Sequence, residues 1–140
     1  MFDLTELWRS VHGLVATLAV AALVHPAVAL RDRPRPGTRW AAGAASALTL
    51  VAFAAGWLLY PGYRTDPKPE LLHRARWLAD LFETKEHLAY TVVTLALSGA
   101  LLVFAGHGPE AIRTARWCYG LAAAVGVAVV ALGTVVGAWG

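Results

Sequence analysis

Apolar residues gather along the chain in four long windows that contain no Asp, Glu, Lys or Arg. The windows cover residues 11–30, 40–60, 88–106 and 117–140, and each is between 19 and 24 residues long. A helix of about 20 apolar residues spans the roughly 30 Å hydrocarbon core of a bilayer. The pattern therefore predicts an all-α, four-helix transmembrane bundle that forms one domain over 1–140, with spans at about 7–30, 40–60, 87–106 and 117–139.

The connection between the second and third spans has a different pattern. It opens with two prolines in an Asp-Pro-Lys-Pro-Glu segment, which is typical of a helix start with proline in the first turn. Apolar side chains then recur on one helical face, at Leu71, Ala75, Leu78 and Phe82, while charged side chains occupy the opposite face. This spacing predicts a short amphipathic helix over about 67–83 that lies at the membrane interface.

Two offsets in the sequence indicate an internal repeat. The segment Arg39–Gly43 resembles Arg116–Gly120 at an offset of 77, and His12 matches His87 at an offset of 75. The matches at offset 77 continue through Ala45, Ala47, Ala54 and Gly56, which meet Ala122, Ala124, Ala131 and Gly133. A repeat of this kind predicts two helical hairpins (2+2) related by a pseudo-twofold axis along the membrane normal.

Composition narrows the class of protein. Hydrophobic residues make up 58% of the chain and charged residues 15%, and the mean hydropathy is +0.55. Soluble domains carry about 25% charged residues, so these values exclude a soluble enzyme, a disordered chain and a nucleic-acid binder. The partner that they imply is the lipid bilayer. The single cysteine, Cys118, excludes an internal disulfide and a thiolate metal cluster.

Charge in the connections predicts the topology. The two short connections, 31–39 and 107–116, together carry a net charge of +4, whereas the other side of the membrane carries −1. Short basic loops stay in the cytoplasm under the positive-inside rule. We therefore expect a multi-pass protein of the bacterial cytoplasmic (inner) membrane, with both termini external.

His87 heads a polar stripe on the third span. The stripe consists of residues at helical spacing, namely Glu83, His87, Thr91, Thr94 and Ser98. Hydroxyl groups in lipid seek protein partners, so we expect this stripe to face the interior of the bundle. It would act there as a hydrogen-bonding or proton-handling site.

Paired histidines support a second interpretation, which is a b-type haem. His12 and His87 enter the same leaflet on two parallel spans, and imidazole is a common axial ligand of haem iron. In that case the two histidines are the metal ligands, and Arg9, Arg64 or Lys85 is expected to meet the haem propionates.

The arrangement resembles that of four-helix membrane cytochromes b, and residues 81–87 with Tyr60–Arg64 resemble segments of uncharacterised bacterial membrane proteins. The resemblance to cytochromes b implies electron transfer with a quinone or a larger complex, whereas the resemblance to uncharacterised bacterial membrane proteins implies no function. His25 and His107 lie on other helical faces than His12 and His87, so the sequence supports one haem at most. Their own roles stay open, and no motif names an enzymatic reaction. The alternative is a cofactor-free membrane subunit, or a small-molecule or proton-handling protein that uses the Glu/His/Thr stripe.

Overall fold

Long α-helices account for nearly all of the structure. The computed structural model describes residues 4–31, 35–65 and 75–139, and in this part of the chain there are four helices and no strands. They are α1 (Leu4–Ala29), α2 (Pro36–Thr65), α4 (Arg76–Ala105) and α5 (Gly108–Trp139). At 1.5 Å per residue, helices of 26 to 32 residues are about 39–48 Å long. All four are apolar enough to cross a membrane, which confirms the predicted all-α bundle with four spans.

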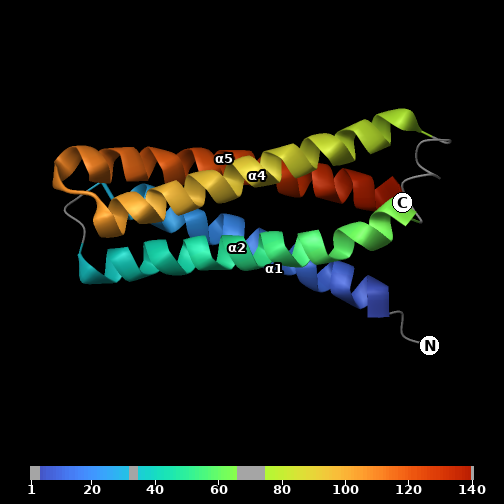
Figure 1. Ribbon diagram of the computed structural model, residues 1–140, viewed down its shortest axis with the longest axis horizontal. Helices are drawn as coiled ribbons and strands as arrows, with labels where there is room; N and C mark the ends of the chain where they lie inside the picture. The colour runs from blue at the N-terminus through green and yellow to red at the C-terminus, as the bar shows by residue number, and fades with distance from the viewer. Residues whose placement is uncertain (1–3, 32–34, 66–74, 140) are drawn as a thin grey trace.

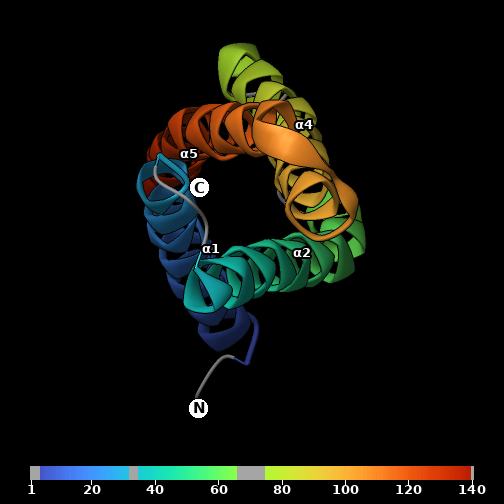
Figure 2. The same cartoon turned by 90° about the vertical axis from the view of Figure 1, so that its left-hand side faces the viewer.

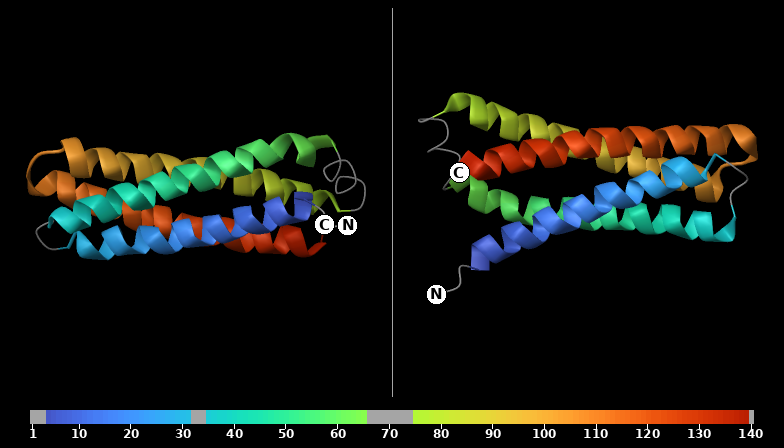
Figure 3. Two further views of the ribbon diagram at one scale, coloured as in Figure 1. Left: turned by 90° about the horizontal axis from the view of Figure 1, so that it is seen from below. Right: turned by 180° about the vertical axis from the view of Figure 1, so that it is seen from behind.

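The helices form a ring in which each helix packs beside two others (Figure 2). α1 contacts α2 and α5, and α4 contacts the same two helices. α1 and α4 therefore lie on one diagonal and run in the same direction, and α2 and α5 lie on the other (Figure 1). We call the end with the α1–α2 and α4–α5 connections the loop end, and the opposite end the terminal end. α1 and α4 diverge toward the terminal end (Figure 3).

The helices are longer than the predicted spans. α5 begins at Gly108, so only Gly106 and His107 connect it to α4. Gly108 has a φ of 82°, a conformation that favours glycine, and Pro109 lies in the first turn of the helix, where its missing N–H costs nothing. A window free of charge marks the stretch of helix that lies in hydrocarbon, and backbone hydrogen bonding continues beyond it.

In the described part of the predicted interfacial helix, residues 76–83 do not form a helix of their own. α4 runs without interruption from Arg76 through Glu83 into the third span, so the second half of the predicted segment is the beginning of that span. No glycine or proline occurs between Arg76 and Ser98 that would end the helix. Residues 66–74 lie outside the described part of the chain.

The buried residues of α1 and α4 have the same spacing. α1 buries Ala19, Leu23 and Pro26, and Leu30 in the turn that follows it is also buried; α4 buries Val92, Ala96, Gly99 and Val103. Both sets follow steps of four, three and four residues, which keep them on one face of a helix. We call these two faces the α1 seam and the α4 seam.

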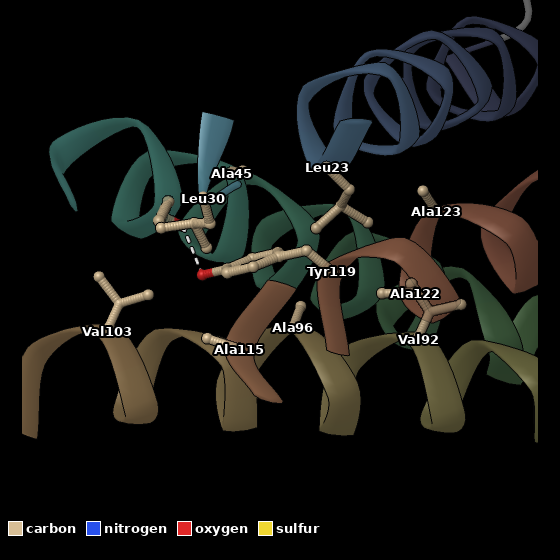
Figure 4. Close-up of a cluster of buried hydrophobic side chains, with 11 residues drawn as sticks. Leu23, Leu30, Ala45, Val92, Ala96, Val103, Ala115, Tyr119, Ala122 and Ala123 are labelled. Carbon is tan, nitrogen blue, oxygen red and sulfur yellow. Dashed lines mark hydrogen bonds between the residues drawn. The ribbon is translucent and has the colours of Figure 1, made fainter. Parts of the chain in front are cut away.

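Tyr119 lies at the centre of the buried cluster near the loop end. Figure 4 shows its ring across the cluster, with Ala96 and Ala115 on one side and Leu23 on the other. The hydroxyl group donates a hydrogen bond to the Ala42 carbonyl at 3.0 Å. It also lies 3.0 Å from Ser46 Oγ, which donates to the Ala96 carbonyl at 2.8 Å. These bonds join α2, α4 and α5.

Candidate functional site

Two ionisable residues continue the buried seams toward the terminal end. His12 lies seven residues before Ala19 on α1, and Lys85 lies seven residues before Val92 on α4. Seven residues are close to two helical turns, so each residue lies on the same face as its seam. Both are half-buried. The bundle thus places a histidine and a lysine on its inner faces, where α1 and α4 begin to diverge.

The His12 ring packs directly on the backbone of α2. A methyl group at Gly56 would lie 2.9 Å from Cε1 of the ring, so the ring fits only because residue 56 is glycine. The ring also interacts with the backbone of Ala52. Its Nδ1 atom is buried and has no hydrogen-bond partner among the described residues. The imidazole is therefore held in place by α2, and one of its ring nitrogens is buried without a hydrogen bond to the described residues.

Lys85 extends from α4 along α5. Its Cδ lies 3.7 Å from the position that a Cβ on Gly133 would occupy. Its ammonium group lies 4.2 Å from the centre of the Phe82 ring, in a cation–π contact. His12 and Lys85 lie at equivalent positions of the α1 seam and the α4 seam, and both are half-buried on the inner faces of their helices. We call this group of residues the His12–Lys85 site.

All four helices contribute to the His12–Lys85 site. α1 supplies His12 and α4 supplies Lys85, while α2 and α5 supply the glycines against which these side chains pack, Gly56 and Gly133. Lys85 precedes the charge-free third window by three residues, or about 4.5 Å of helix. The site therefore lies at the border between the hydrocarbon and the interface.

His87 does not share this site. It lies two residues beyond Lys85, about 200° around the helix, and it is exposed. Its Nδ1 atom lies 2.7 Å from the carbonyl oxygen of Glu83, one turn earlier in the same helix. A haem held by both histidines would require His12 and His87 to face each other across the bundle. His87 does not face the interior. Haem ligation by the two residues stays an untested prediction.

The polar stripe of α4 also lies toward the outside. Glu83, Thr91 and Thr94 are exposed, and Ser98 is half-buried. Thr91 Oγ1 donates to the carbonyl oxygen of His87 at 3.3 Å, within its own helix. A hydroxyl that bonds the preceding turn needs no partner on another helix. This is why the stripe can face lipid although its residues are polar.

The remaining candidate residues are spread over the bundle. Arg9 and His25 are exposed on α1, and His107 is exposed in the turn between α4 and α5. Arg64 belongs to α2, and its side chain is outside the described part of the structure. Within the described residues, no group of three or more His, Cys, Asp or Glu side chains could hold a metal ion.

Lys85 was expected only beside haem propionates, although its spacing in the sequence carried a stronger signal. Leu78, Lys85, Val92 and Gly99 follow one another at intervals of seven, and the other three are buried. A charged residue in register with a buried seam is predicted to face the interior.

Comparison of the chain with protein-family models, with curated proteins and with solved structures finds no match.

Proposed function

We propose that the protein is a multi-pass membrane protein that binds the polar head of a small amphiphilic molecule at the His12–Lys85 site. The observation that carries the proposal is the buried Nδ1 atom of His12, which lacks a described partner on the same inner surface as the Lys85 ammonium group. A buried polar atom without a partner costs about 1–3 kcal/mol, and a bound molecule would remove this cost.

The donor and acceptor chemistry defines the kind of head group. An ammonium group donates hydrogen bonds, whereas a neutral imidazole nitrogen can accept one or take up a proton. A head group that combines a carbonyl or acidic oxygen with a hydroxyl matches this pair, and the head of a quinone or quinol belongs to this class. The apolar helices around the site suit a molecule whose remainder is hydrocarbon. A hydroxyl bound at His12 could also pass its proton to the ring.

The cost of the site favours a functional role over a structural one. Lysine costs about 2.5–3.5 kcal/mol at the centre of a membrane helix on insertion scales and less near the interface, and ionisable residues inside membrane bundles commonly mark a binding or transport site. Lys85 lies on the inner face, although an exposed position, that of Glu83, is available two residues away. A purely structural residue at this point of the seam would be apolar.

We also propose that the bundle is a 2+2 hairpin repeat with the His12–Lys85 site on its pseudo-twofold axis. The spacing of the buried residues supports an offset of 73 between α1 and α4, which pairs His12 with Lys85 in place of His87. The offset of 77 between α2 and α5 pairs Gly56 with Gly133, the two glycines of the site. On this alignment, each hairpin contributes one basic side chain and one glycine.

The proposal is tested by measuring what the protein retains when it is purified into lipid nanodiscs. Small molecules are extracted and quantified by mass spectrometry for the wild type, His12→Ala, Lys85→Met and the control His87→Ala. We expect a compound near one equivalent in the wild type and in His87→Ala, and its loss from the two site variants. The same content in all four proteins, or no retained compound in any of them, would contradict the proposal.

A second candidate function is electron transfer through a b-type haem. Two observations favour it: His12 has a ring nitrogen without a described partner, and His87 has its Nδ1 atom on a carbonyl, as haem-ligating histidines commonly do. Because His87 faces outward, a haem bound there would lie at the edge of the bundle. Absorption spectra of protein from haem-replete cells test this function. A Soret band that is lost in His12→Ala and His87→Ala supports it, and a colourless protein refutes it.

A further inference from the structure

Two Arg-Trp pairs lie at the same depth near the loop end. Arg39-Trp40 belongs to α2 and Arg116-Trp117 to α5, and these diagonal helices run in the same direction. Arg39 lies three residues before Ala42, and Arg116 lies three residues before Tyr119. The Tyr119 hydroxyl donates a hydrogen bond to the Ala42 carbonyl. That bond fixes the relative level of the two helices, so the depths of the pairs agree to within about one helical turn of 5.4 Å.

Both tryptophans face the outside of the bundle. Trp40 is 76% exposed and Trp117 is 61% exposed. Exposed tryptophans near the ends of membrane helices lie at the level of the lipid head groups. Arg39 is exposed beside Trp40, and the Arg116 guanidinium lies 5.7 Å from the centre of the Trp117 ring. Each pair therefore has a guanidinium group, exposed in Arg39 and half-buried in Arg116, beside an aromatic ring on the outside of the bundle.

The loop end carries a strong excess of positive charge. Its described charged residues are Arg31, Arg35, Arg39, Glu110, Arg113 and Arg116. The carboxylate of Glu110 lies 2.6 Å from Arg113 Nη2, so the acidic charge described at this end is directed to one arginine. Every described cation here is arginine, whose planar guanidinium binds a phosphate through two parallel hydrogen bonds.

We infer that the loop end binds acidic phospholipids, with Arg39 and Arg116 as the two phosphate-binding residues. Two sites at one depth, on opposite corners of the bundle, would hold one lipid each. Acidic lipids are favoured over zwitterionic ones because the surrounding arginines add to the local positive potential. This site is independent of the His12–Lys85 site, which lies toward the other end of the helices.

The test compares how well an acidic and a zwitterionic lipid are retained. Purified protein in nanodiscs of phosphatidylcholine with a minority of phosphatidylglycerol is released into the gas phase, and bound lipids are counted by native mass spectrometry. The variants are Arg39→Gln, Arg116→Gln and the double variant. The matched control is Arg113→Gln, because Arg113 belongs to the same end and already contacts Glu110.

We expect the wild type to retain phosphatidylglycerol in preference to phosphatidylcholine. The preference should fall about five-fold for each of Arg39 and Arg116 removed, which corresponds to about 1 kcal/mol per arginine. It should fall clearly less in Arg113→Gln, which changes only the surrounding potential and whose charge already contacts Glu110. A wild type without preference would overturn the inference. So would an equal loss in Arg113→Gln, since that result would mean that general charge, and not the two Arg-Trp pairs, selects the lipid.

Discussion

The hydroxyl group of Tyr119 offers a sharp test of the packing, because it is a buried polar group that joins three helices. It donates to Ala42 on α2 and contacts Ser46 Oγ, which itself donates to Ala96 on α4. The Tyr119 hydroxyl thus donates to one carbonyl group and the Ser46 hydroxyl to another, and the two hydroxyl oxygens lie 3.0 Å apart. Tyr119→Phe removes one proton donor and leaves the bond from Ser46 to Ala96 in place.

The expected cost follows from this count. A hydrogen bond contributes about 1 kcal/mol in general, and bonds between membrane helices average about 0.6 kcal/mol. The Ala42 carbonyl keeps its helical hydrogen bond, and the ring stays packed against Gly99. We therefore expect Tyr119→Phe to lower the free energy of unfolding by about 0.5–1.5 kcal/mol. Tyr119→Ala, which also empties the space of the ring, should cost about 3–5 kcal/mol.

The assay is reversible unfolding in mixed micelles with an increasing fraction of SDS, followed by circular dichroism. A double-mutant cycle with Ser46→Ala should give a coupling free energy of about 0.5 kcal/mol or more, because the two hydroxyl groups are in direct contact. Thr134→Ala serves as the control, since its hydroxyl bonds its own helix at an exposed position. Tyr119→Phe as costly as Tyr119→Ala, or a coupling of zero, would refute this account of the network.

Three further predictions concern the bundle and its orientation. Gly99→Ala should lower the free energy of unfolding by about 1–3 kcal/mol, because its methyl group would meet the Tyr119 ring at 2.9 Å. Gly120→Ala has open space for the methyl group and should leave this free energy unchanged. Equal effects of the two changes would argue against the contact between Gly99 and Tyr119. Lys85→Met should leave the free energy of unfolding unchanged or raise it. Leu78→Asp, at a position that is 2% exposed, should lower this free energy by several kcal/mol. The reverse order would contradict the assignment of these residues to the α4 seam. A cysteine introduced at Pro36 should react with a membrane-impermeant reagent only from the cytoplasmic side, and labelling from outside would reverse the proposed topology.

Much of the fold could be predicted from the sequence, because hydrocarbon excludes charge. Each window without Asp, Glu, Lys or Arg lies within one of the four helices, apart from the last residue of three of the windows. The ends of the helices could not be predicted in this way. Residues 76–87 of α4 carry five charged side chains and are nevertheless helical, since helical hydrogen bonding does not depend on the surrounding lipid.

The candidate site was predicted only in part. His12 packs on Gly56 of α2, on the inner surface, whereas the polar stripe headed by His87 was expected in the interior and lies outside. The buried residues of α1 and α4 share the same spacing, and Lys85, not His87, lies in register with those of α4. The Tyr119 network could not be predicted at all, because it depends on which helices lie on the diagonal.

The 15N chemical shifts of the His12 ring in lipid bilayers test the His12–Lys85 site most directly. The His12 signals are assigned by their absence from the spectrum of His12→Ala, and the same spectra are then recorded for Lys85→Met and His87→Ala. We predict that Lys85→Met moves the His12 signals, because both side chains lie on the inner faces of the bundle toward the terminal end, and that His87→Ala leaves them in place, because His87 is exposed. His12 signals that move in His87→Ala and stay unchanged in Lys85→Met would contradict the site.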